Sequence, residues 1–136
     1  MVDLEAEFER ALAVYDGTNF ETLPPRDQIL ITIWGLEADV NNGGFDQFYF
    51  NSYGDLALFA PVALDQIGAP AMAALVREAN SYFGDDGPPR DRDLRQKRLL
   101  ALTEKHDDLF GQLDERFFEY PDDIAGLLAA FLTALS

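Results

Sequence analysis

Helical spacing of the apolar residues runs through almost the whole chain and constrains the fold more than any other feature. Leu4, Phe8 and Leu12 lie four residues apart, and Ile29 and Ile33 repeat the same step. Steps of three and four place side chains on one face of an α-helix, whereas a half-buried strand needs apolar residues at every second position. No segment has a convincing period of two. We therefore predict an all-α fold.

Turn-forming residues divide this pattern into about six to eight expected helices. The clearest interruptions are DGTNFETLPP, NNGG, GAP and FGDDGPPRD, because glycine, asparagine and proline favour turns and helix ends. Thr22 and either Asp107 or Asp108 have the chemistry of an N-cap, and Pro121 is expected to open the last helix. The helices expected between these signals cover about residues 4–15, 23–40, 45–53, 56–67, 71–82, 91–105, 107–117 and 121–135.

The length of 136 residues predicts one compact domain that spans residues 1–136. A hydrophobic fraction of 48% is sufficient for a core without disulfides, and we expect Trp34, Phe45, Phe48 and Leu102 to be largely buried in it. The absence of cysteine excludes disulfides, thiolate zinc sites and thiol nucleophiles. No run resembles a signal peptide or reaches transmembrane length, so we expect a cytoplasmic protein with no membrane partner.

The charge is strongly acidic, with 25 Asp and Glu against 10 Lys and Arg and a net charge of −15. Such a field argues against direct binding to nucleic acid or to anionic membranes, because both need cationic side chains. Half of the basic residues lie within nine positions, namely Arg90, Arg92, Arg95, Lys97 and Arg98. An acid-rich proteome would give the same totals. Geometry separates the two explanations, because a binding surface gathers carboxylates on one face.

The sequence gives no positive indication of an enzyme or a cofactor. His106 is the single histidine, and its place on the apolar stripe of residues 99–117 favours a packed core residue over a ligand. Without a second His or any Cys, a transition-metal site is not expected. The aspartates of DDGPPRDRD lack the order of a calcium-binding loop, although an oxygen-only Mg²⁺ or Ca²⁺ site stays open. NNGGFDQ lacks the lysine of a phosphate-binding loop.

The segment NNGGFDQFYFNSYG combines a twin glycine with aromatic and amide side chains. On a helix its rings occupy more than one side, which is typical of a segment wedged between neighbouring helices. The nearest charges are acidic, so stacking on single-stranded nucleic acid is disfavoured. We therefore expect a structural motif rather than a ligand site. Its residues are Asn42, Gly43, Gly44, Phe45, Gln47, Phe48 and Asn51.

The stretch NGGFDQFYFNSYGD, the IGA that follows the next helix, and LDERFFEYPDDIAGLLAAFL resemble a bacterial family of DNA-mimic proteins, which was first catalogued as a domain of unknown function. The likeness covers about residues 25–135. It implies an all-helical fold and a homodimer. It also implies that an acidic surface occupies the DNA site of a transcription regulator or another nucleic-acid-binding protein. The basic run at residues 90–98 departs from a uniformly DNA-like face.

A DNA mimic needs rows of carboxylates on a rigid scaffold, since B-DNA carries about one negative charge per 1.7 Å of its axis. The segment from residue 104 to 123 supplies eight candidate partner-binding acids: Glu104, Asp107, Asp108, Asp114, Glu115, Glu119, Asp122 and Asp123. Some of them are expected to cap helices instead. Asp3, Glu5, Glu7 and Glu9 form a second candidate row, although they alternate around a helix.

Two other classes of function stay open. One is a protein-interaction or antitoxin-like module that acts through apolar and aromatic surface, with the acidity a proteome bias. The other is an uncharacterised enzyme. Exposed rings at residues 45–53 would favour the interaction module, and an ordered metal or a deep polar cleft would favour the enzyme.

Overall fold

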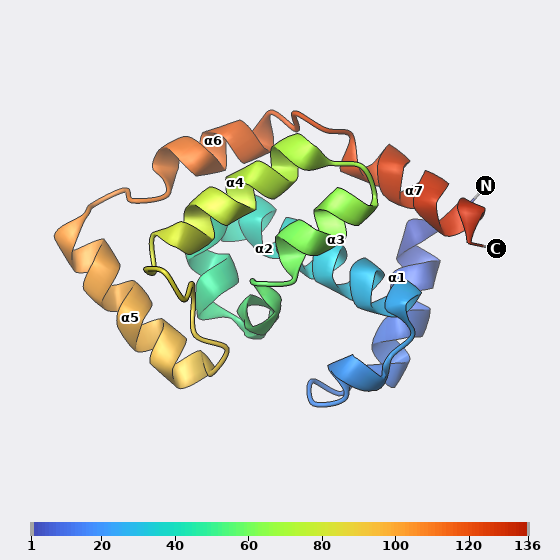
Figure 1. Ribbon diagram of the computed structural model, residues 1–136, viewed down its shortest axis with the longest axis horizontal. Helices are drawn as coiled ribbons and strands as arrows, with labels where there is room; N and C mark the ends of the chain where they lie inside the picture. Colours follow the sequence, from blue (N-terminus) through green and yellow to red (C-terminus); the bar gives the residue numbers. More distant parts are fainter. Residues whose placement is uncertain (1, 136) are drawn as a thin grey trace.

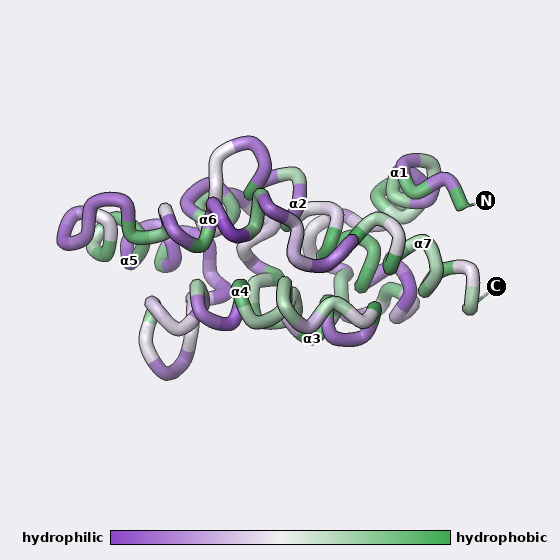
Figure 2. The backbone as a smooth tube through the Cα atoms, turned by 90° about the horizontal axis from the view of Figure 1, so that it is seen from above, coloured by the Kyte–Doolittle hydropathy of each residue, from purple (hydrophilic) through white to green (hydrophobic). Residues whose placement is uncertain are grey.

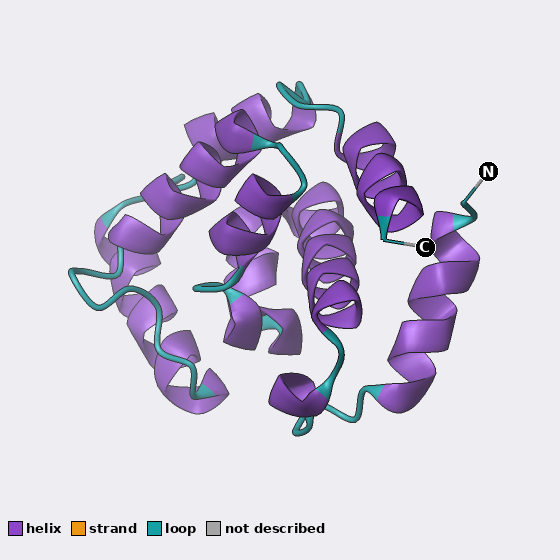
Figure 3. Ribbon diagram, turned by 45° about the vertical axis from the view of Figure 1, so that its right-hand side comes forward, coloured by secondary structure: helices purple, strands orange, loops and turns teal. Residues whose placement is uncertain are grey.

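The computed structural model describes residues 2–135, and this part of the chain contains seven α-helices and no strand (Figure 3). The predicted all-α class is confirmed. Within the described residues, no helix is both long enough and apolar enough to cross a membrane. The helices are α1 (Leu4–Val14), η1 (Phe20–Thr22), α2 (Pro25–Phe50), η2 (Ser52–Leu56), α3 (Ala60–Gln66), α4 (Pro70–Ser81), α5 (Arg92–Lys105), α6 (Gly111–Phe118) and α7 (Ile124–Ala134), where η marks a short 3₁₀ helix.

Helix α2 lies at the centre and contacts α1, α3, α5 and α6 (Figure 1). α3 and α4 are joined by a short turn and cover one side of α2, whereas α1 and α7 lie at one end of the molecule and α5 at the other (Figures 1 and 2). Because neighbours surround α2, its apolar residues are buried around its whole circumference, as Ile31, Ile33 and Leu36 show. An amphipathic helix would bury a single stripe.

Aromatic side chains form the core between the second half of α2 and α6. Phe45 packs edge-on against Phe117 with ring centroids 5.8 Å apart, and Tyr49 packs against Phe83 at 4.7 Å. Phe45 and Phe48 are fully buried, as predicted. Trp34 is only partly buried. It stacks on Phe8 at a centroid distance of 4.8 Å. Leu102, also predicted to be largely buried, is likewise only partly covered.

Two predicted N-caps and one predicted helix start are wrong, whereas the prolines expected at the start of α2 are found there. Thr22 lies in η1, where its hydroxyl donates to the Asn19 carbonyl, and α2 begins at Pro25 without a side-chain cap. Helix α6 begins at Gly111 rather than after Asp107 or Asp108, and no side chain caps it. Pro121 lies in the loop before α7, whose first turn is capped by the Asp123 side chain.

His106 is exposed, which overturns its predicted place in the core. Helix α5 ends at Lys105, and His106 has φ −133° and ψ 90°, so the chain leaves the helix at this residue. The apolar stripe therefore does not continue in phase through residue 106. Leu99 before the break and Leu113 after it are both buried, but they belong to separate helices.

Candidate functional site

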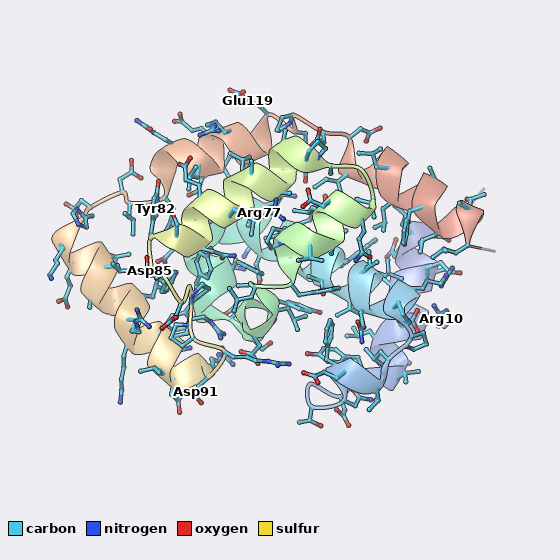
Figure 4. All side chains as sticks on the ribbon, in the orientation of Figure 1. Arg10, Arg77, Tyr82, Asp85, Asp91 and Glu119 are labelled. Carbon is cyan, nitrogen blue, oxygen red and sulfur yellow. The ribbon has the colours of Figure 1, made fainter. Side chains whose placement is uncertain are left out.

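Six of the eight predicted acids are exposed, and five of these six cap no helix: Glu104, Asp107, Asp108, Glu115 and Glu119. No cationic side chain in the described chain lies within 4 Å of any of these five carboxylates. Glu115 and Glu119 are four residues apart at the end of α6, which places them on one face of that helix. Figure 4 shows Glu119 pointing away from the body of the molecule. These carboxylates are free to meet a partner.

The other three predicted acids hold helix ends together. Asp114 accepts a hydrogen bond from the Phe45 N–H at 2.8 Å, and Asp122 accepts one from the Met72 N–H at 2.9 Å in the first turn of α4. Asp123 accepts from the Gly126 N–H at 3.2 Å and so caps α7. The first N–H groups of a helix lack an intrahelical partner, and a carboxylate satisfies them. These three side chains therefore have a structural task.

An acidic hollow lies between α5, α6 and the second half of α2, with a volume of about 260 Å³. Its carboxylates are Asp46, Asp107, Asp108 and Asp114. Desolvation raises the pKa of Asp114, as do the nearby charges of Asp108 and Asp46, against the opposing effect of the Phe45 N–H. Desolvation also raises the pKa of Asp46. Between residues 2 and 135, no three Asp, Glu or His side chains are placed to hold a metal ion.

Asp46 is the acid of this hollow that sequence reasoning missed. It lies on α2, far along the chain from α6, and only the tertiary fold brings the two together. The local signal was its position directly after the Gly-Gly-Phe of the aromatic segment. Asp46 was counted only among the acidic charges that disfavour stacking on nucleic acid, and it was placed neither in the structural motif nor in the acidic surface.

The twin glycine breaks α2 and faces the same hollow. Gly44 has φ 74° and ψ −175°, a conformation that only glycine adopts without strain. A Cβ atom at Gly44 would lie 2.4 Å from Asp114 Oδ2, so glycine is also needed for the close approach of α6. Directly after the break, the Phe45 N–H donates to Asp114 Oδ1, which ties the second half of α2 to α6.

Amide side chains of the motif form hydrogen bonds across this break in α2. Asn42 Nδ2 donates to Gln47 Oε1 at 2.8 Å. Gln47 Nε2 and Asn51 Nδ2 both donate to Asp39 Oδ1, at 3.0 and 3.2 Å. The motif therefore links the two halves of α2. Its aromatic residues Phe45 and Phe48 are buried, so these two rings offer no surface for a partner, whereas Phe50 of the same segment is 43% exposed.

Three arginines of the basic run at residues 90–98 donate hydrogen bonds to backbone carbonyls, and one of them is buried. Arg95 is 0% exposed and donates to the backbone carbonyls of Tyr49, Asn51, Pro89 and Arg90. Its Nη1 also lies 2.9 Å from Asp55 Oδ1. Arg92 and Arg98 donate to the carbonyls of Phe50 and Phe83. These arginines tie α5 to the end of α2, to Asp55 of η2 and to the loop that joins α4 to α5.

Residues 21–135 match the family model described as DMP19-like protein. Comparisons with curated proteins and with solved structures gave no match. The matched range contains the glycine break in α2, the buried Arg95 and the acids around α6. It agrees with the resemblance carried by NGGFDQFYFNSYGD. Because the match covers most of the chain, the protein belongs to the DMP19-like protein family.

Proposed function

We propose that the protein is a DNA mimic that occupies the DNA-binding surface of a transcription regulator or of another nucleic-acid-binding protein. Membership of the DMP19-like family carries this proposal, because the family resemblance implies DNA mimicry. The protein acts by binding alone, without catalysis and without a cofactor, and it does so in the cytoplasm.

The arrangement of the acids supports the proposal. Carboxylates from two regions distant in the sequence, Asp46 and residues 107–114, converge on one hollow. The exposed Glu104 and Glu115 lie on the two helices that border it, and Glu119 directly follows one of them. A proteome bias alone would scatter such groups over the surface. The burial of Arg95 removes one cation of the basic run from the surface, which weakens the objection that this run interrupts a DNA-like face.

The proposal includes a homodimer, which rests on the family resemblance. The surplus of aromatic residues at 45–53 no longer supports it, because Phe45, Phe48 and Tyr49 are fully buried within one chain. Phe50 is the only ring of this segment that is classed as exposed, at 43%. A dimer must therefore use another surface.

The proposal is tested by capture of partners from an extract of the host cell. The protein is immobilised, and bound proteins are eluted with duplex DNA and identified. A parallel column carries a variant with Glu104→Gln, Asp107→Asn, Glu115→Gln and Glu119→Gln, which keeps side-chain shape and removes four exposed charges. Asp114 is left intact because it caps the second half of α2. We expect a DNA-binding protein on the first column and little of it on the second.

A third column separates position from total charge. It carries Glu5→Gln, Glu9→Gln, Asp85→Asn and Asp86→Asn, which also removes four exposed charges but leaves the acids of residues 104–123 intact. This column is expected to retain the partner. If it loses the partner while the α6 variant keeps it, the binding face lies elsewhere. If no column retains a DNA-binding protein, DNA mimicry is wrong and the scattered-acid explanation takes its place.

A further inference from the structure

A second candidate surface lies at the opposite end of the molecule from the acidic hollow. Helices α1 and α7 lie at that end of the molecule, beside α2 (Figures 1 and 3). Residues of these three helices line a groove of about 380 Å³. The groove is lined by Leu4 of α1, by Trp34, Glu37, Ala38 and Asn41 of α2, and by Ala125 and Leu128 of α7. Neither the family match nor the proposed DNA mimicry accounts for it.

The walls of this groove are apolar and its shape is fixed. The indole ring of Trp34 stacks on Phe8 with an interplanar angle of 9°, which holds it at the surface between α1 and α2. Ala38 and Ala125 are exposed, and their small side chains leave the groove open between the helices. Residues 124–135 contain no charged residue, so α7 is the least polar edge of a strongly acidic protein (Figure 2).

Glu37 places a carboxylate within this apolar surface. Its Oε2 accepts a hydrogen bond from the Tyr120 hydroxyl at 2.8 Å, and the same hydroxyl accepts one from Asn41 Nδ2. In the described part of the chain no Lys, Arg or His nitrogen lies within 4 Å of Glu37. Burial raises the pKa of Glu37, and the charge of Asp123 raises it further. A cation beside this carboxylate would relieve an uncompensated negative charge.

We propose that this groove binds an amphipathic, cationic helix of a partner protein, with an apolar side chain against Trp34 and a Lys or Arg beside Glu37. An apolar groove between helices is a common receptor for the apolar face of a helix. The charge complementarity selects a basic partner. A second copy of this chain fits less well, because it would bring a further net charge of −15 toward Glu37 and Asp123.

Two synthetic peptides of about fourteen residues test this proposal. Both contain the same leucines and lysines. The first places leucine at helical spacing to make one apolar face, and the second distributes it evenly. Trp34 is the only tryptophan, so its fluorescence reports occupancy of the groove directly. We expect the first peptide to bind and to shift the emission, and the second to bind at least about tenfold more weakly.

Variants distinguish the groove from general charge attraction. Glu37→Gln is expected to weaken the first peptide about tenfold, because it removes one partly buried charge-assisted contact. Glu115→Gln removes the same charge at the far end of the molecule and should have little effect. Ala125→Glu adds bulk and charge at an exposed position of the groove wall, and it should abolish the fluorescence shift. It also serves as the test if Glu37→Gln impairs folding, which urea unfolding would reveal.

Three results would overturn the proposal. Equal affinities for the two peptides would mean that only net charge is recognised. Equal effects of Glu37→Gln and Glu115→Gln would mean that Glu37 has no special role. Sedimentation of the wild type as a dimer, with Ala125→Glu as a monomer, would show that the groove is covered by a second copy. DNA mimicry at the α5–α6 end is independent of all three results.

Discussion

Replacement of the buried Arg95 by methionine is expected to destabilise the protein strongly. Arg95 donates four hydrogen bonds to backbone carbonyls, with donor–acceptor distances of 2.7 to 3.1 Å, and pairs with Asp55. Methionine fills part of the volume but offers no donor. The change therefore leaves buried acceptors without partners and one carboxylate without its cation.

The size of the effect follows from these contacts. A buried acceptor that loses its partner costs about 1–3 kcal/mol, but water can reach some of these carbonyls once the guanidinium is gone. The Asp55 side chain is 33% exposed, so solvent already screens its charge and the loss of the pair counts for less. The expected loss of unfolding free energy is about 3–5 kcal/mol. For a domain of this size that corresponds to a fall in Tm of roughly 10–20 °C.

Urea unfolding followed by Trp34 fluorescence measures this loss, and Lys97→Met is the matched control. Lys97 lies on the same helix and is exposed, so its replacement changes the net charge equally and should alter stability by no more than about 0.5 kcal/mol. Arg95→Lys should remain far below wild type, because an ammonium group cannot reach the same fork of acceptors. Equal stability of Arg95→Met and Lys97→Met would refute the structural role of the basic run.

Three further outcomes are expected. Gly44→Ala should lower the free energy of unfolding by about 2–4 kcal/mol, because it strains the backbone and displaces Asp114. Gly17 also has a positive φ but has open space around it, so Gly17→Ala should cost only about 1 kcal/mol. Equal losses in thermal melts would contradict the close approach of Asp114 to Gly44. Tm should rise as pH falls from 7 toward 5, because the pKa values of Glu37, Asp46 and Asp114 are raised and the folded state therefore binds protons before the unfolded state does. The lowered pKa values of Glu7 and Asp16 cost stability only below about pH 4. A Tm that falls between pH 7 and pH 5 would contradict this prediction. Light scattering at moderate salt should report a homodimer, and a monomer at high protein concentration would remove dimerisation from the proposal.

Helix boundaries were predictable where a local signal and the tertiary structure agree. Asp91 accepts from the Leu94 N–H, and α5 begins within one residue of the prediction. The glycine pair breaks α2 where expected, although helical hydrogen bonding resumes directly at Phe45. The start of α6 was not predictable from caps. Phe110 packs in the aromatic core, and the helix follows it rather than the aspartates before it.

The candidate site was likewise predictable only in part, because local sequence gives residue types and the tertiary fold decides their roles. Residue types indicated an acidic segment, but only the fold separates a carboxylate that caps a helix, such as Asp114, from a free one such as Glu115. Nothing local distinguishes Arg95 from Lys97, because burial depends on which face of α5 meets η2. The groove at Glu37 also stayed hidden, since α1 and α7 lie at opposite ends of the sequence and meet only around α2.

The central claim is that this protein and DNA compete for one surface of a partner. The most direct measurement is fluorescence anisotropy of labelled duplex DNA bound to the captured regulator, with this protein as the competitor. DNA mimicry predicts complete release of the DNA, with weaker competition as salt rises, because the attraction is largely Coulombic. The variant with Glu104, Asp107, Glu115 and Glu119 neutralised should compete poorly while it unfolds near the wild-type midpoint. A complex that holds the regulator, the DNA and this protein together would contradict the claim.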